Sequence, residues 1–268
     1  MPRNLQNKVI VITGASSGIG AATAKACAEA GMRVVAAARR IEKLQAIIAP
    51  MGDRGLAVAC DVDRDSDVKH LFETAREHFG RVDAIFANAG YGLTMPVDQT
   101  TDEQTRAIFE TNFHGTMRCI RFGLPLLRAT DDGLKHMLIC SSAASEIGVP
   151  GYGVYAATKA AQDSIAQAMR AELHHEKIYV TSVHPVGTRT EFFTTAAKQS
   201  NKPATKGTNT PTLLEQTPDH VAKKVVRALR RPRAEVWPLG IARFALGFAT
   251  LFPGLTAWAL RRKPNTNA

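Results

Sequence analysis

The chain has 268 residues, of which 45% are hydrophobic and 22% are charged, a composition that can bury a core of the size found in α/β domains. Its four cysteines are scattered without the spacing of metal ligands, which excludes a cysteine metal site and predicts small buried side chains in a reducing compartment. The net charge of +10 lies almost wholly in residues 221–268, where the charges are mixed with apolar residues and form no recognised nucleic-acid-binding module.

Six apolar segments bounded by turn residues predict β-strands. They are 8–13, 33–38, 56–60, 82–87, 135–141 and 178–183. Helical patterns lie between them at 18–30, 41–49, 65–79, 102–128 and 153–176. Strands that are apolar on both faces and alternate with helices are typical of a parallel sheet covered on both sides. The expected fold class is therefore α/β, with a doubly wound parallel sheet of the Rossmann type.

The expected domain organisation is one Rossmann-fold domain over residues 1–238, followed by a C-terminal amphipathic extension over 239–268. Inside the domain, residues 188–217 are polar and show no clear period. A long irregular segment in a compact domain is usually a lid or a binding loop, so we expect this one to bind the substrate.

The first predicted strand runs into the glycine-rich sequence TGASSGIG, residues 13–20, at the start of a helix. Gly14 permits a tight turn, Gly18 removes a side chain where a ligand must approach, and Gly20 allows close helix–strand packing. The free N–H groups at the helix N-terminus suit a pyrophosphate. The candidate cofactor-binding residues of this turn are Gly14, Ser16, Ser17, Gly18, Ile19 and Gly20.

The spacing TGxxxGxG, rather than GxGxxG, resembles the short-chain dehydrogenase/reductase family in its single-domain branch. Further family motifs follow in the expected order, so the resemblance extends over roughly residues 5–235. It implies a Rossmann fold, a nicotinamide dinucleotide cofactor, and an activity that interconverts carbonyls and alcohols by hydride transfer.

The end of the second strand predicts which nicotinamide cofactor is bound. In dinucleotide folds an acid at this point binds the ribose hydroxyl of NAD, whereas an arginine accepts the 2′-phosphate of NADP. Here the strand is followed by Arg39 and Arg40, and the first acid, Glu42, lies in the next helix. A cation at a helix N-terminus opposes the helix dipole and so calls for another explanation. NADP(H) is therefore expected; if the two arginines are only a solvated pair, NAD(H) is the alternative.

Two more segments match family positions that contact the cofactor. The residues are Asp61, Val62, Asn88, Ala89 and Gly90. The resemblance implies that Asp61 meets the adenine amino group, although Asp61 or Asp63 could equally be the N-cap of the following helix. Residues 88–90 match the end of the NNAG motif, which supports the sheet and lines the cofactor. Ala87 replaces the first asparagine of that motif.

Tyr155 and Lys159 are spaced i and i+4 and therefore share one face of the helix 153–176. A phenol with an ordinary pKa of ~10 is a poor base near neutral pH, and a nearby ammonium lowers that pKa. The resemblance implies that Tyr155 is the acid/base and that Lys159 also binds the nicotinamide ribose. It further implies that Ser142 orients the substrate oxygen and that Asn112 holds a water that joins Lys159 to solvent.

The segment after the last predicted strand, HPVGTRT, matches the family sequence PGxVxT, with Val186 in place of the first glycine. The candidate cofactor-binding residues are Pro185, Val186, Gly187, Thr188 and Thr190, in addition to Tyr155 and Lys159. In the family this segment holds the nicotinamide carboxamide, which implies transfer of the pro-S hydride.

The sequence thus predicts an NADP(H)-dependent oxidoreductase. Apolar side chains in 91–97, 143–154 and 188–217 favour a lipophilic substrate, unless they only pack the loop. The alternative function is a non-catalytic dinucleotide-binding sensor, or a membrane-associated scaffold of the same fold. The family resemblance also implies a homodimer or homotetramer, formed through the helices 102–128 and 153–176.

The C-terminal segment 241–260 carries a helical apolar stripe that Pro253 should kink or split. It is too short between arginines for a membrane span. The stripe could instead pack on the enzyme or on a neighbouring subunit, or residues 241–263 could lie in a membrane interface near anionic headgroups. No apolar signal region follows the N-terminus, so a cytoplasmic location is expected, with this possible peripheral contact.

Overall fold

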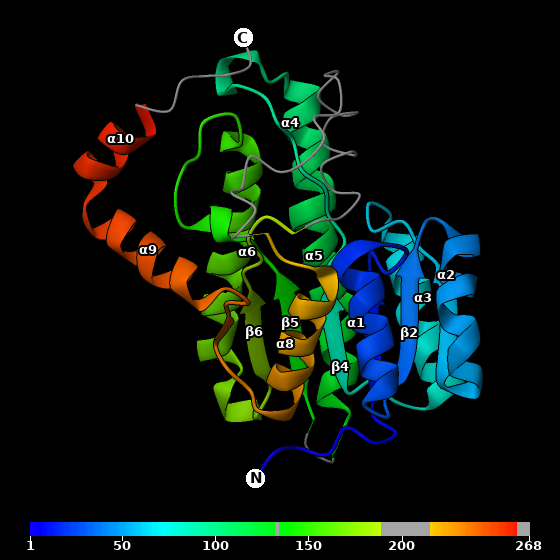
Figure 1. Ribbon diagram of the computed structural model, residues 1–268. Helices are drawn as coiled ribbons and strands as arrows, with labels where there is room; N and C mark the ends of the chain where they lie inside the picture. Colours follow the sequence, from blue (N-terminus) through cyan, green and yellow to red (C-terminus); the bar gives the residue numbers. More distant parts are fainter. Residues whose placement is uncertain (132–133, 189–214, 262–268) are drawn as a thin grey trace.

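In the computed structural model, residues 1–131, 134–188 and 215–261 are described. They contain one sheet of seven parallel strands in the order β3-β2-β1-β4-β5-β6-β7. The strands are β1 (Val9–Thr13), β2 (Arg33–Ala38), β3 (Gly55–Ala59), β4 (Ala84–Ala87), β5 (His136–Cys140), β6 (Tyr179–Val183) and β7 (Glu235–Val236). The six predicted strands and the doubly wound parallel sheet are confirmed, and the short β7 is an addition at the edge (Figure 1).

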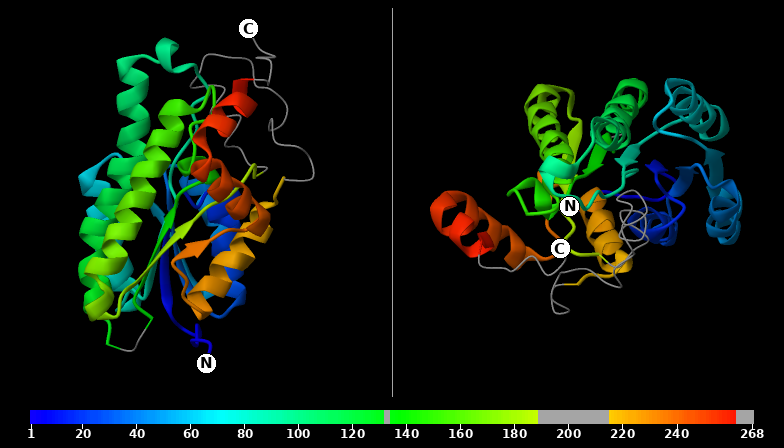
Figure 2. Two further views of the ribbon diagram at one scale, coloured as in Figure 1. Left: turned by 90° about the vertical axis from the view of Figure 1, so that its left-hand side faces the viewer. Right: turned by 90° about the horizontal axis from the view of Figure 1, so that it is seen from above.

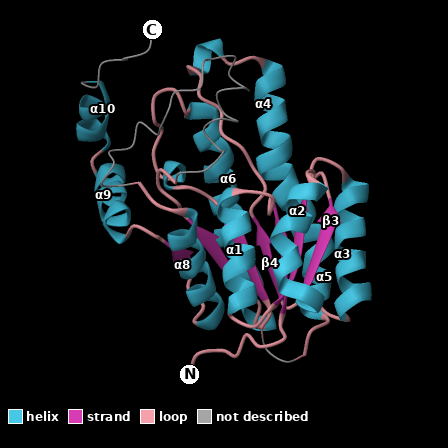
Figure 3. Ribbon diagram, turned by 45° about the vertical axis from the view of Figure 1, so that its right-hand side comes forward, coloured by secondary structure: helices cyan, strands magenta, loops and turns pink. Residues whose placement is uncertain are grey.

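Helices cover both faces of this sheet (Figures 2 and 3). One layer is formed by α1 (Gly18–Glu29), α2 (Ile41–Ile48) and α8 (Pro218–Arg230), and the other by α3 (Asp65–Phe79), α5 (Gly115–Arg128) and α6 (Gly153–Glu172). The remaining helical elements are α4 (Asp102–Phe109), α9 (Gly240–Leu251), α10 (Pro253–Arg261), and the short stretches η1 (Ala49–Arg54), η2 (Val97–Gln99), η3 (Glu110–His114), η4 (Ala143–Ser145) and η5 (His174–Glu176).

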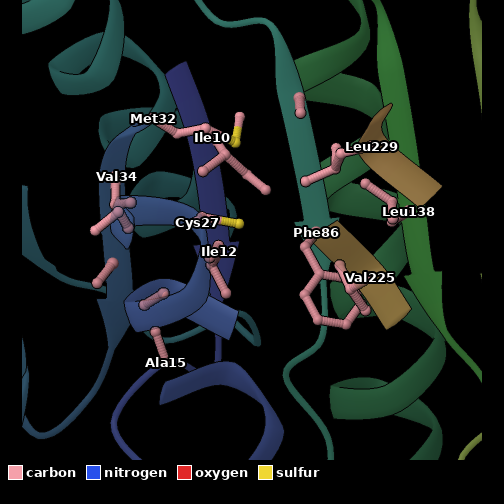
Figure 4. Close-up of a cluster of buried hydrophobic side chains, with 14 of the residues drawn as sticks. Ile10, Ile12, Ala15, Cys27, Met32, Val34, Phe86, Leu138, Val225 and Leu229 are labelled. Carbon is pink, nitrogen blue, oxygen red and sulfur yellow. The ribbon is translucent and has the colours of Figure 1, made fainter. Parts of the chain in front are cut away.

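Each strand contributes to two hydrophobic cores because successive side chains point to opposite faces. On one face, Ile10 and Ile12 of β1 pack with Cys27 of α1, Phe86 of β4 and Val225 of α8 (Figure 4). On the other face, alternate residues of the same strands pack against α3, α5 and α6. All four cysteines are free and buried, as the sequence predicts. This double burial fixes the strand ends, and with them the turns that follow.

The predicted helix over 102–128 is interrupted in the middle. The stretch η3 between α4 and α5 is a π-helical turn, with Asn112 fully buried inside it. The wider turn frees the Asn112 carbonyl, which accepts hydrogen bonds from the Thr116 hydroxyl (2.8 Å) and the Gln162 amide (2.7 Å). Such π-turns often occur at functional sites. The apolar pattern of the sequence predicts one helix over 102–128 and does not reveal this wider turn.

The helices α9 and α10, which we call the C-terminal arm, lie beside the sheet's edge and away from its core (Figure 1). No residue of either helix is buried. Seven large apolar side chains are 49% to 79% exposed, namely Ile241, Phe244, Phe248, Leu251, Phe252, Leu255 and Trp258. Packing of this stripe on the enzyme's own surface is therefore not seen among the described residues.

The break predicted at Pro253 is present, and the two helices of the arm are bent by 107° relative to each other. Within the described ranges, no helix taken alone has the length and apolar character needed to cross a membrane. The two helices of the arm pass that test only as a bent pair, by length and composition.

Candidate active site

The glycine-rich turn after β1 has the backbone shape that its sequence predicts. Gly14 and Gly18 have φ values of +65° and +54°, a region that favours glycine. A Cβ on Gly14 would lie 2.8 Å from the Ala89 Cα, and a Cβ on Gly20 would lie 2.7 Å from the Asn88 amide nitrogen. Side chains at these positions would therefore separate the turn from the strand end, and the helix N-terminus would lose its close approach to a ligand.

Arg40 lies over this turn. Its guanidinium donates hydrogen bonds to the Ser16 hydroxyl (3.0 and 3.2 Å) and to the Ser17 hydroxyl (3.1 Å). Ser17 is the N-cap of α1, and its side chain makes no capping bond to the first turn among the described residues. The result is an exposed cation beside a helix N-terminus, which fits a ligand with several phosphates. Arg39 is also exposed.

The segment after β3 forms a local turn and does not cap a helix. The Asp61 carboxylate accepts from the Asp63 amide, and the Asp61 amide donates to Asp67. The N-cap of α3 is Arg64, so the alternative role of Asp61 or Asp63 as the N-cap is wrong. Val62 is buried beneath this turn.

The Asn88 segment connects the ends of two neighbouring strands. The Asn88 side chain donates to the Thr13 carbonyl at 2.9 Å, and the amides of Asn88 and Ala89 both donate to the Thr13 hydroxyl at 3.1 Å. A Cβ on Gly90 would lie 2.9 Å from Asn112 Oδ1 and 3.6 Å from Lys159 Nζ. This loop therefore lies directly between the glycine-rich turn and the predicted catalytic residues.

Ser142 and Tyr155 meet at the carboxyl end of β5. Ser142 is the N-cap of η4, and its hydroxyl forms a hydrogen bond with the Tyr155 phenol. Burial raises the pKa of Tyr155 above its ordinary value, and the hydrogen bond from Ser142 opposes that rise. The neighbouring Ser141 points the other way and donates to the Lys159 carbonyl at 3.0 Å, as strand alternation predicts.

Lys159 is buried one turn along α6 from Tyr155. Its ammonium lies 5.7 Å from the centre of the Tyr155 ring and donates to the Cys140 carbonyl (2.8 Å) and to Gln162 (2.9 Å). Burial lowers the pKa of Lys159, and the Cys140 thiol opposes this effect. In this arrangement burial has the largest influence on the Tyr155 pKa, so the predicted lowering by Lys159 remains a prediction.

Asn112 is placed on the inner side of the same site. Its side chain accepts from the Tyr91 amide and donates to the Tyr91 carbonyl and the Thr158 hydroxyl, each at 3.0 Å. It therefore fixes the loop after β4 against α6. Within the described residues it is connected to Lys159 through Gln162.

The segment after β6 lies on the other side of Ser142. The Pro185 carbonyl accepts from the Ala143 amide at 3.0 Å, and the Val186 amide donates to the Gln216 side chain at 3.4 Å. Gly187 has a φ of +35°, and Thr188 forms a bridge with Gln216. Thr190 and most of the predicted loop 188–217 lie outside the described residues.

Three functional candidates were missed from the sequence. Gln162 joins Lys159 to Asn112. Asp163, the next residue of α6, forms a buried pair with His184, which follows β6, with 3.4 Å between Asp163 Oδ1 and His184 Nε2. The His184 ring stacks on Trp237 at 4.4 Å. For Gln162 and Asp163 the available signal was a pair of polar residues, three and four positions after Lys159, on the buried face of an alanine-rich helix.

Part of the apolar wall predicted for the substrate packs around Tyr155 instead. Leu93 is buried in a small cluster with Ile108 and Tyr155, and Met95 packs against it. Val97 is 65% exposed. For Leu93 the packing interpretation is therefore the one that the structure favours.

In this doubly wound sheet, a phosphate-binding turn and a tyrosine–lysine pair meet at the carboxyl ends of the strands. That combination defines an oxidoreductase of the nicotinamide-dinucleotide class. A sequence model described as short chain dehydrogenase matches residues 8–201. The chain belongs to the short-chain dehydrogenase/reductase family of oxidoreductases.

Known proteins support this assignment. An uncharacterized oxidoreductase of Listeria innocua is 34% identical over 251 residues, which cover 92% of this chain and 98% of the relative. The 3-ketoacyl-(acyl-carrier-protein) reductase of Brucella melitensis complexed with NADH superposes with a TM-score of 0.76, at 29% identity over 87% of this chain and 96% of that one. An alcohol dehydrogenase of Thermococcus sibiricus complexed with 5-hydroxy-NADP gives a TM-score of 0.73, at 27% identity over 87% and 95%.

Proposed function

We propose that this protein is an NADP(H)-dependent oxidoreductase that interconverts a carbonyl and an alcohol on an apolar substrate. The observation that carries the proposal is the hydrogen-bonded pair of Ser142 and Tyr155, with the Lys159 ammonium 5.7 Å from the Tyr155 ring. This group lies at the same sheet edge as the glycine-rich turn. When bound there, the nicotinamide would supply the hydride that reduces the carbonyl carbon, or accept it in the reverse direction.

Each side chain has a separate task in this chemistry. The Ser142 hydroxyl donates a hydrogen bond to the substrate oxygen and holds it beside Tyr155. As the carbonyl is reduced, Tyr155 gives its proton to that oxygen, and in the oxidation direction it takes the proton back. Lys159 places a positive charge near the phenolate that is left, which opposes the effect of burial on the Tyr155 pKa.

The proposed preference for NADP(H) depends on Arg40. Its guanidinium already contacts Ser16 and Ser17, so it needs only a small adjustment to bind a 2′-phosphate at the end of β2. No acid precedes Glu42 at this position to bind a ribose hydroxyl. The similar solved structures include one with NADH and one with an NADP derivative, and Arg40 is the feature of this chain that favours the second.

A screen of NADPH oxidation tests this function, with ketones and aldehydes of graded size and polarity as substrates. Apolar ketones should be reduced fastest. In Tyr155→Phe turnover should fall by about 10²–10⁴-fold, the usual contribution of a general acid, while NADPH affinity stays nearly intact. Near-wild-type turnover of Tyr155→Phe would refute the assignment, and preference for polyols would refute the apolar substrate. NADPH binding by the wild type without turnover of any carbonyl would favour the non-catalytic sensor.

We also propose self-association through α5 and α6. The surface between these helices has an apolar groove of about 330 Å³. Its lining includes Met117, Ile120, Leu124, Ile165, Ala168 and Met169. An apolar face shared by two long helices suits a two-fold, self-complementary contact. Light scattering at micromolar concentration should show a dimer or tetramer, and a pure monomer would contradict the proposal.

The C-terminal arm supports a further proposal, a peripheral membrane contact of a cytoplasmic enzyme. Two helix axes that meet at one break can both lie in a single plane, so the bend of 107° allows both helices to rest in the same interface. Their exposed apolar side chains would enter the headgroup region, and Arg243 and Arg261 would lie near anionic lipids. This placement suits an apolar substrate that partitions into the bilayer.

A further inference from the structure

Gln162 is a buried glutamine that the proposed chemistry does not use. It lies on α6 three residues after Lys159 and is 1% exposed. All its hydrogen-bonding groups have protein partners. Nε2 donates to the Asn112 carbonyl (2.7 Å) and to the Thr116 hydroxyl (2.6 Å), while Oε1 accepts from Lys159 Nζ (2.9 Å). A buried amide with all its hydrogen bonds made favours one arrangement of its partners, because the loss of one partner leaves a buried polar group unpaired at a cost in free energy.

The surroundings of Gln162 fix which way its amide points. The Thr116 hydroxyl donates its only hydrogen to the Asn112 carbonyl, so it can only accept from Gln162. The Asn112 carbonyl is an acceptor as well. Both contacts therefore require the N–H side of the amide, and the oxygen must face Lys159. A flipped amide would place its N–H groups against the Lys159 ammonium, and its oxygen against two acceptors, the Asn112 carbonyl and the Thr116 hydroxyl.

Lys159 depends on this oxygen. Its ammonium has three hydrogens, and two of them are directed to neutral oxygens, those of Cys140 and Gln162. The site is buried, so a neutral acceptor stabilises the charged form against desolvation. The chain of contacts runs from the π-turn at Asn112, through the Gln162 amide, to the ammonium beside Tyr155.

We propose that Gln162 is a positioning residue: it holds the Lys159 ammonium next to Tyr155 and keeps that ammonium protonated. This inference rests on the proposed function, because the task of Lys159 is taken from it. Asn112 and Thr116 act through Gln162, since they set the direction of its amide. The sequence separation of 50 residues between Asn112 and Gln162 shows that this is a tertiary contact between two elements.

The charged and titratable groups around Lys159 come from three directions. The Cys140 thiol belongs to β5, and the Tyr155 phenol precedes Lys159 on α6. In the third group, a buried pair, Asp163 lies on α6 and His184 lies after β6. The π-turn contributes the neutral side chain of Asn112. The Gln162 oxygen now lies 2.9 Å from the Lys159 ammonium. A carboxylate in place of the Gln162 amide would therefore put a negative charge in direct contact with that ammonium.

Two substitutions of similar size make opposite predictions. Gln162→Met removes the acceptor, so Lys159 should lose its proton at lower pH. Gln162→Glu adds an anion, so Lys159 should keep its proton to higher pH. NADPH affinity is measured by fluorescence titration from about pH 7 to about pH 10, and the pH at which the affinity is lost is the alkaline limit. Compared with the wild type, this limit should be about one pH unit lower in Gln162→Met and about one unit higher in Gln162→Glu. A role in packing alone would move both limits in the same direction or neither.

The controls are Gln167→Met and Gln167→Glu, at an exposed glutamine of the same helix that bonds Asp163 rather than Lys159. These variants should leave the alkaline limit within about 0.3 pH units of the wild type, below the scale of a charge-partner shift. In a Lys159→Met background, the difference between the two Gln162 variants should disappear. Equal shifts in the controls, or a difference that survives without Lys159, would overturn the proposal.

Thermal unfolding of the cofactor-free protein gives a second readout. Because burial lowers the pKa of Lys159 in the folded state, this group makes stability rise as the pH increases toward its unfolded pKa of ~10.4. The rise should be steeper in Gln162→Met and shallower in Gln162→Glu. If the wild type binds neither NADPH nor NADH, the proposed function fails, and the melting curves still decide the Gln162 inference. Equal slopes in both variants would overturn that inference even if NADPH binds.

Discussion

The Rossmann-fold body, residues 1–238, and the C-terminal arm contain similar amphipathic helices, but the apolar faces are buried in the body and exposed in the arm. Helix α8 has 13 residues and buries Val221, Val225 and Leu229 against the sheet and α1. Helix α9 has 12 residues and buries none, although Phe244 and Phe248 form an apolar stripe of the same period. Both sequences satisfy the rule for an amphipathic helix. An apolar stripe of this kind therefore predicts a helix with a covered face, but not what covers that face.

The largest expected difference between the two regions is in stability. Phe86 is fully buried in β4, and Phe86→Ala should lower the free energy of unfolding by about 3–5 kcal/mol, because it removes apolar contacts and leaves a cavity. Phe248→Ala in the arm should change it by no more than about 0.5 kcal/mol. Urea denaturation measures both. Similar losses in the two variants would show that the arm is packed on a subunit in solution.

A second test compares two exposed arginines, Arg40 over the glycine-rich turn and Arg106, which forms an ion pair with Asp102 on α4. Arg40→Ala should weaken NADPH binding by about 10–100-fold, the range of a charge-assisted hydrogen bond of about 1.5–3 kcal/mol, and should leave NADH binding within about twofold. Fluorescence titration with both cofactors measures this. Arg106→Ala, at an exposed arginine of α4, is the matched control and should change neither affinity. Equal weakening of both cofactors by Arg40→Ala would contradict the NADP(H) preference.

A third prediction concerns the buried carboxylate of α6. Burial would raise the pKa of Asp163, but the neighbouring His184 imidazole, 3.4 Å away, and the hydrogen bond from Gln167 outweigh it and lower that pKa to about 2. A lowered pKa contributes stability that is present above the unfolded pKa of ~3.9 and is lost as the pH falls toward 2. Asp163→Asn should therefore cost about 2 kcal/mol near pH 7 and progressively less below pH 4. Urea denaturation at several pH values checks this, and a loss that does not depend on pH would contradict it.

The smallest expected effect on stability comes from removal of the arm. A chain that ends at Leu239 should melt within about 2 °C of the full chain, because the arm buries no residue. The same truncation should abolish co-sedimentation with anionic vesicles, and the binding of the full chain should weaken with salt. If the full chain does not bind vesicles and the truncated chain is unstable, the arm has a packing role instead.

Much of the body could be predicted because its signals are local. The strand–turn–helix at 9–29 follows from the apolar strand sequence VIVIT, three glycines and an alanine-rich helix in that order. The two-residue strand β7 was missed because it is too short to show any period. The π-turn at Asn112 was missed because it inserts a wider turn without changing which residues are apolar.

The strands, the glycine-rich turn and the shared helix face of Tyr155 and Lys159 could be read from the sequence alone, because each depends on neighbours within one strand, turn or helix. The contact of Arg40 with Ser16, 24 residues away, and the link that Gln162 makes between Lys159 and Asn112 depend instead on the packing of separate elements. The exposure of the apolar stripe of the arm likewise became visible only in the folded chain. Contacts of this kind depend on how whole elements pack, and the periodicity of a single element contains no information about its partner.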